Sequence, residues 1–124
     1  MTAKKVLYVD DENDIREVAQ MSLELDPGFN VRACASGASA ITEAAQWQPD
    51  IILLDVMMPE MDGPETLRRL QAHPSTSGIA VVFITARTQT HEVEHYKSLG
   101  AAGVIAKPFD PMRLAHTVRS FIAA

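Results

Sequence analysis

The side chains of this 124-residue chain that could do chemistry lie at the ends of short apolar runs. Asp10 and Asp11 follow the first run, Asp55 follows the third, Thr85 ends the fourth and Lys107 follows the fifth. A carboxylate that accepts a phosphoryl group needs a divalent cation to offset charge, with a lysine and a hydroxyl to bind the phosphoryl oxygens. These residues supply such a set, and Asp55 is the candidate nucleophile.

Each acidic position alone also has an ordinary structural explanation. An Asp before a helix can cap it or interact with its dipole, and a lone Asp after a strand can be a turn residue. Parallel neighbouring strands, however, would bring Asp10, Asp11 and Asp55 together, and like charges so close repel by roughly 1 kcal/mol per pair in water. We therefore expect a cation among them, and oxygen ligands with room for water favour Mg²⁺.

The elements that must position these residues are predicted by hydrophobic patterns. Segments with helical spacing separate the apolar runs. In the first such segment an apolar stripe is formed by Ile15, Val18, Ala19 and Leu25, and Pro27-Gly28 predicts the helix end. The five runs have strand length, and most are rich in Val and Ile: 6–9, 31–34, 51–54, 80–84 and 104–106.

Strands that are apolar throughout are buried on both faces, which indicates a parallel sheet covered by helices on either side. We therefore predict one α/β domain over residues 1–124, a doubly wound five-stranded parallel sheet flanked by five helices. In such sheets a binding site forms beyond the carboxyl ends of the strands, where the candidate residues lie.

Composition narrows the function classes. The chain is 47% hydrophobic and 22% charged, as in ordinary globular proteins. Its net charge of -5 argues against direct binding to nucleic acid or anionic membranes, and its apolar runs are far shorter than the ~20 residues of a membrane helix. No leader pattern begins the chain, so we expect a cytoplasmic location. Cys34 is the only cysteine, which rules out an internal disulfide.

Several segments together resemble the receiver domains of two-component response regulators, including the single-domain chemotaxis type. The resemblance implies a flavodoxin-like sheet with strand order 2-1-3-4-5. It spans nearly the whole chain in the family's order, and the combination at these spacings is highly specific. The matching segments are 9–11, 54–63, 84–86, 100–103 and 107–109.

The resemblance implies a chemical role for each acid. Asp55 would accept a phosphoryl group from a phosphohistidine on a sensor histidine kinase or a histidine phosphotransfer protein. Asp11 would hold Mg²⁺ directly and Asp10 largely through water, with Asp55 and the backbone carbonyl of Met57 as the remaining protein ligands. The domain would promote its own phosphorylation and dephosphorylation without turning over a separate substrate, so it would not be an enzyme.

The resemblance also implies how the phosphorylated state is read. Lys107 would pair with phosphoryl oxygens, Thr85 would move to hydrogen-bond one of them, and the Lys107-Pro108 peptide would be cis. Val104 stands where many members carry a Tyr or Phe that turns inward with the threonine, a swing that valine cannot make. We expect a stand-alone receiver whose downstream target is a protein, bound by the fourth helix, fifth strand and fifth helix, including His95 and Tyr96.

Two alternatives belong to other classes. His91 to His95 match the H-E-x-x-H signature of zinc proteases, which we interpret as a solvated helix face because a protease site needs a third ligand and a water-excluding cleft. A Mg²⁺-dependent phosphohydrolase with an aspartyl nucleophile would typically carry a second Asp two positions later, whereas Met57 follows Asp55 at that spacing. Multiple turnovers on a phosphate ester would favour that enzyme over a switch.

Overall fold

A computed structural model describes residues 3–122 of the chain. Strands and helices alternate throughout this range, which confirms the predicted pattern. Their bounds are β1 (Lys4–Val9), α1 (Asn13–Leu23), β2 (Phe29–Cys34), α2 (Gly37–Trp47), β3 (Ile51–Asp55), α3 (Gly63–Gln71), β4 (Ala80–Thr85), α4 (Thr90–Ser98), β5 (Gly103–Ala106) and α5 (Leu114–Ile122).

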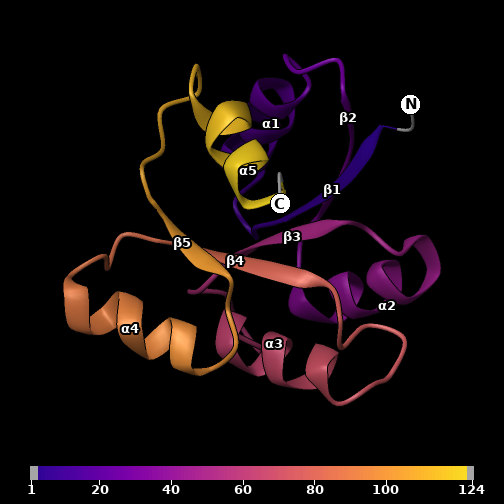
Figure 1. Cartoon of the computed structure of the whole chain (residues 1–124), viewed down its shortest axis with the longest axis vertical. Coiled ribbons are helices and arrows are strands. Elements are labelled where there is room, and N and C mark those ends of the chain that lie inside the picture. Colours follow the sequence, from indigo (N-terminus) through magenta and orange to yellow (C-terminus); the bar gives the residue numbers. More distant parts are fainter. Residues whose placement is uncertain (1–2, 123–124) are drawn as a thin grey trace.

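The sheet has the order β2-β1-β3-β4-β5, and every neighbouring pair is parallel. Helices α1 and α5 cover one face, and α2, α3 and α4 cover the other (Figure 1). The fold is therefore the predicted doubly wound α/β sheet, with the implied strand order. All five residues of β3 are buried, as expected for a central strand between two layers of helices.

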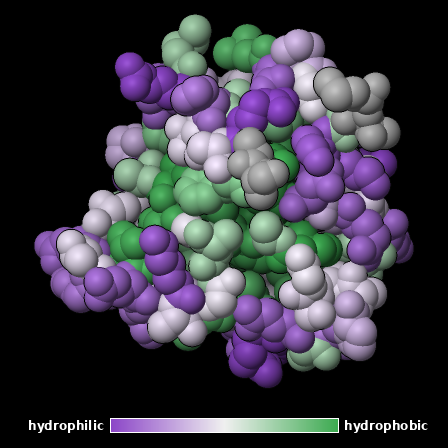
Figure 2. Space-filling model, in the orientation of Figure 1, coloured by the Kyte–Doolittle hydropathy of each residue, from purple (hydrophilic) through white to green (hydrophobic). Residues whose placement is uncertain are grey.

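The core forms two clusters, one on each face of the sheet. In the view of Figure 2, hydrophobic residues gather at the centre, between the helices of the two layers, and hydrophilic residues make up most of the rim. The observed strands extend the predicted runs by one or two residues, mostly at their first residues, where exposed Lys4 and buried Phe29 still pair across the sheet. Within residues 3–122, no helix combines the length and apolar character required to cross a bilayer.

The apolar stripe predicted for the first helix is partly wrong. Val18 is 44% exposed and Leu25 is 62% exposed, whereas Leu23 is fully buried. For Leu25 the reason is that α1 ends at Leu23 with Glu24 as its C-cap, before the predicted end at Pro27-Gly28. Leu25 therefore lies outside the helix, and its side chain does not continue the buried stripe.

Candidate functional site

The predicted site residues come together at the carboxyl edge of the sheet. Asp10 directly follows β1, Asp55 is the last residue of β3, Thr85 is the last residue of β4, and Lys107 directly follows β5. Carboxylate oxygens of Asp10, Asp11 and Asp55 all lie within 4.8 Å of one another. Parallel strands end at the same edge of a sheet, and this geometry converts positions far apart in the sequence into one cluster.

Lys107 supplies the positive charge of this cluster. Its Nζ lies 3.0 Å from Asp10 Oδ2 and 3.5 Å from Asp55 Oδ1, and its side chain is only 16% exposed. The Lys107 backbone N–H donates to the Thr85 carbonyl at 2.9 Å, which fixes the lysine to the end of β4. The Lys107-Pro108 peptide is cis, as the resemblance implied.

Burial and charge set the protonation of the cluster. Burial of the Asp55 carboxyl, followed by the nearby charge of Asp10, raises the pKa of Asp55 to about 6, although Lys107 opposes the rise. Burial alone would lower the pKa of Lys107, but its hydrogen bond to Asp10 and the charges of Asp55 and Asp10 outweigh burial and raise it. Near neutral pH the site therefore combines an ionised, buried Asp55 with a protonated lysine.

One residue of the site, Tyr8, is absent from the set predicted from the sequence. Its hydroxyl donates a 3.0 Å hydrogen bond to Asp10 Oδ2 inside the cluster. Burial, and then the charge of Asp10, raises the pKa of Tyr8, so the phenol stays protonated and remains a donor. The signal was present in the spacing, since residues i and i+2 of a strand lie on the same face.

The candidate switch residues lie on the side of the sheet that α4 covers. The Thr85 hydroxyl is buried and accepts a 3.0 Å hydrogen bond from the Arg87 backbone N–H. Val104 is half-buried against the core cluster under α2, α3 and α4, and it pairs in register with Phe83. Tyr96, expected on the partner surface, is instead only 8% exposed, because its ring packs edge-on against Phe83 with centroids 5.1 Å apart.

The remaining predicted residues lie outside the cluster. The Met57 side chain is 74% exposed, so only its backbone could serve the site. His91 and His95 are both exposed on α4. Across residues 3–122, the only group of three or more His, Cys, Asp or Glu side chains close enough to share a metal ion is Asp10, Asp11 and Asp55.

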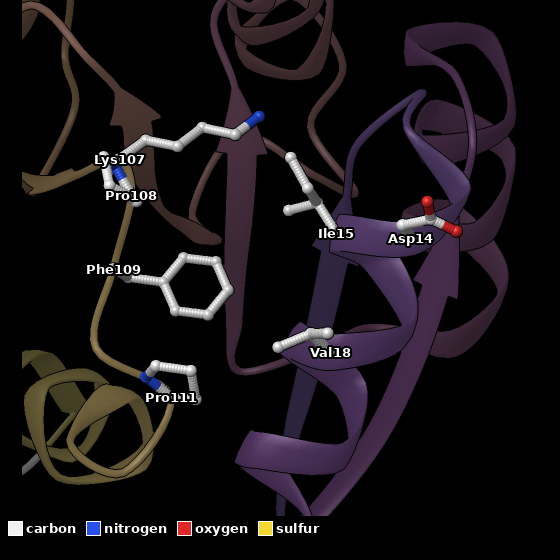
Figure 3. A pocket seen from close by; sticks show the side chains of 7 residues that line it. All are labelled: Asp14, Ile15, Val18, Lys107, Pro108, Phe109 and Pro111. Carbon is white, nitrogen blue, oxygen red and sulfur yellow. The ribbon is translucent and has the colours of Figure 1, made fainter.

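A largely apolar hollow of about 240 Å³ opens beside the cluster, between α1 and the segment that follows β5. Ile15 and Val18 line it from α1, and Phe109 faces them across the hollow (Figure 3). The aliphatic part of the Lys107 side chain also lines the hollow, while its Nζ donates to Asp10. The hollow and the acid cluster therefore share one residue.

The loop between β3 and α3 depends on a glycine that approaches the site closely. A Cβ at Gly63 would lie 2.7 Å from the Asp55 carbonyl oxygen and 2.9 Å from Val56 Cα. We predict that Gly63→Ala lowers the free energy of unfolding by about 1–3 kcal/mol, the usual cost of overpacking. Urea unfolding measures the change. Gly78→Ala is the matched control, because nothing lies within 4 Å of its Cβ position; equal effects at the two glycines would contradict the packing argument.

A doubly wound parallel sheet with an acid cluster and a lysine at its carboxyl edge is the arrangement that the sequence resemblance implied for a signalling receiver. The family model described as "Response regulator receiver domain" matches residues 6–119. The chain belongs to this family.

Curated relatives and solved structures agree with this assignment. DNA-binding response regulator MtrA of Mycobacterium tuberculosis is 35% identical over 117 residues, which are 94% of this chain and 50% of the relative. Transcriptional regulatory protein CseB of Streptomyces coelicolor is 37% identical over 117 residues, covering 94% and 48%. The chain thus spans about half the length of the curated relatives it matches. The chemotaxis response regulator CheY4 of Vibrio cholerae has a TM-score of 0.88 and 32% identity, covering 97% of this chain and 99% of that one.

Proposed function

We propose that this chain is a phosphorylation-controlled switch in which Asp55 accepts a phosphoryl group from a phosphohistidine of a sensor kinase or phosphotransfer protein. The observation that carries the proposal is the buried Asp55 carboxylate held beside two further acids and the Lys107 ammonium. A carboxylate oxygen of Asp55 attacks phosphorus as the phosphorus–nitrogen bond of the donor breaks, and the imidazole leaves with the bonding electron pair. Membership of the receiver family disfavours the phosphohydrolase alternative.

The three carboxylates fit Mg²⁺, since the donor set consists of hard oxygen ligands within reach of one ion. Asp10, Asp11 and Asp55 would hold it, together with the Met57 carbonyl. When bound, Mg²⁺ supplies positive charge against the phosphoryl oxygens. The residues of the chain keep Asp55 ionised and oriented. Lys107 would leave Asp10 and bind a phosphoryl oxygen.

Thr85 links this chemistry to α4. To donate its hydroxyl hydrogen to a phosphoryl oxygen, Thr85 would turn away from the Arg87 backbone N–H that it now accepts from. The Arg87 side chain lies 3.8 Å from Glu92 of α4, so a shift of the loop would reach that helix. Val104 would accommodate this movement without an aromatic swing. We propose α4, β5 and α5 as the surface for a protein target, with exposed His95 on it, in the cytoplasm and without direct contact to nucleic acid.

Chemical phosphorylation tests the proposal directly. Incubation with acetyl phosphate and Mg²⁺ should add a single phosphoryl group, detected by intact mass spectrometry and mapped to Asp55, and Asp55→Asn should carry none. Asp110→Asn is the matched control, because Asp110 is an exposed acid after β5 and should not affect labelling. An adduct that persists in Asp55→Asn, or repeated turnover of a small phosphate ester, would reject the switch.

A further inference from the structure

Tyr8 carries a hydroxyl that the fold does not require. Its side chain is fully buried in the core cluster under α1 and α5, and its ring packs edge-on against Phe109 with centroids 6.5 Å apart. A phenylalanine would fill the same space and make the same apolar contacts. What the hydroxyl adds is therefore its 3.0 Å hydrogen bond to Asp10 Oδ2.

The Asp10 carboxylate is held by three donors that come from three different segments. Oδ2 accepts from the Tyr8 hydroxyl and from Lys107 Nζ, each at 3.0 Å, and Oδ1 accepts from the Glu12 backbone N–H at 3.0 Å. Lys107 has other acids to attract it, since Asp55 Oδ1 lies 3.5 Å from its Nζ. Tyr8 lies within β1 and pairs with β2 on one side and β3 on the other, so its hydroxyl is the donor to Oδ2 that stays in place when the lysine moves.

We propose that Tyr8 is a positioning residue for the acid cluster: its hydroxyl fixes the orientation in which the Asp10 carboxylate faces Asp11 and Asp55, and so prepares the cluster for Mg²⁺. This inference rests on the proposed function. Groups that hydrogen-bond to a metal ligand and fix its orientation commonly contribute about 10–100-fold to metal affinity or activity, because a ligand that is already oriented loses less freedom on binding.

Tyr8→Phe tests the inference by removing only the hydroxyl. We expect isothermal titration calorimetry to show Mg²⁺ affinity about tenfold weaker in Tyr8→Phe than in the parent protein. Phosphorylation by acetyl phosphate should slow at low Mg²⁺ and recover toward the parent rate at saturating Mg²⁺, a split that a general loss of stability would not produce. Thermal unfolding curves fix a temperature at which both proteins are fully folded for the titration.

The chain provides a matched control in its other tyrosine. Tyr96 is also buried, but it lies on α4 and packs against Phe83, away from the acids, so Tyr96→Phe should bind Mg²⁺ like the parent. Unchanged affinity in Tyr8→Phe, or equal weakening in the two variants, would overturn the role of Tyr8 while the phosphorylation of Asp55 stands. A parent protein that binds no Mg²⁺ and takes no phosphoryl group would instead overturn the proposed function, and this inference with it.

Discussion

Asp55→Asn is expected to stabilise the metal-free protein at neutral pH, although it removes the group on which the proposed function depends. The carboxylate is buried among like charges, and its pKa in the folded state, about 6, exceeds the ordinary value of 3.8. That difference corresponds to about 3 kcal/mol of unfavourable free energy when the group is ionised. An uncharged amide of the same shape avoids this cost, so urea unfolding in EDTA at pH 7 should show a gain of about 2–3 kcal/mol.

The stabilisation expected from Asp55→Asn should depend on pH. Between pH 3.8 and about 6 the folded state binds more protons at Asp55 than the unfolded state does, so the stability of the parent protein falls as pH rises through this window. Below pH 3.8 Asp55 is neutral in both states. The advantage of Asp55→Asn should therefore disappear there and be complete above pH 6.

An exposed acid serves as the control for this series. Glu94→Gln on α4 makes the same chemical change at a solvated position and should leave the free energy of unfolding at pH 7 within about 0.5 kcal/mol of the parent value. If Asp55→Asn were less stable than the parent at pH 7, the cost assigned to burying the Asp55 charge beside Asp10 would be wrong. Adding Mg²⁺ should narrow the gap between the parent and Asp55→Asn, because the ion stabilises only the folded state that binds it.

Lys107→Met is expected to have the opposite effect on the same cluster. The methionine keeps an aliphatic side chain lining the apolar hollow but removes the only ammonium within reach of Asp10 and Asp55 among residues 3–122. Leaving buried carboxylates without their cationic partner typically costs about 3–5 kcal/mol. We expect a loss of about 3 kcal/mol in EDTA at pH 7, measured by urea unfolding, together with a weaker response to phosphorylation.

Two comparisons isolate the charge as the cause. Lys97→Met removes an exposed lysine from α4 and should leave stability within about 0.5 kcal/mol of the parent. The double variant Asp55→Asn with Lys107→Met should be more stable than Lys107→Met alone, since it has one fewer buried negative charge to leave unpaired. Additive effects of the two substitutions would show that Asp55 and Lys107 do not interact.

The sheet and the acid cluster were predictable because each follows from a local pattern and one topological rule. A run such as Ile51–Asp55, apolar up to its last residue, specifies a strand covered on both faces, and parallel strands share their carboxyl edge. The order of the strands, which makes β1 and β3 neighbours, was available only through resemblance to the family, as was the cis Lys107-Pro108 peptide.

The errors arose where the outcome depends on tertiary packing. Leu25 continues the helical spacing of α1, but periodicity does not specify where a helix stops. Tyr96 was placed on a binding surface, and only the position of Phe83 on the neighbouring strand shows that its ring is covered. Tyr8 was not predicted as a site residue, because the partner of a buried hydroxyl depends on which strand ends lie beside it in the fold.

The ion pair between Lys107 and Asp10 joins residues 97 positions apart. During synthesis all three acids leave the ribosome long before the lysine that offsets them, because Lys107 follows β5, the last strand of the sheet. A chain truncated before β5 would hold a concentrated negative charge at the edge of an unfinished sheet. Because the lysine comes from the segment after β5, the charge-balanced site is complete only when the whole domain has assembled.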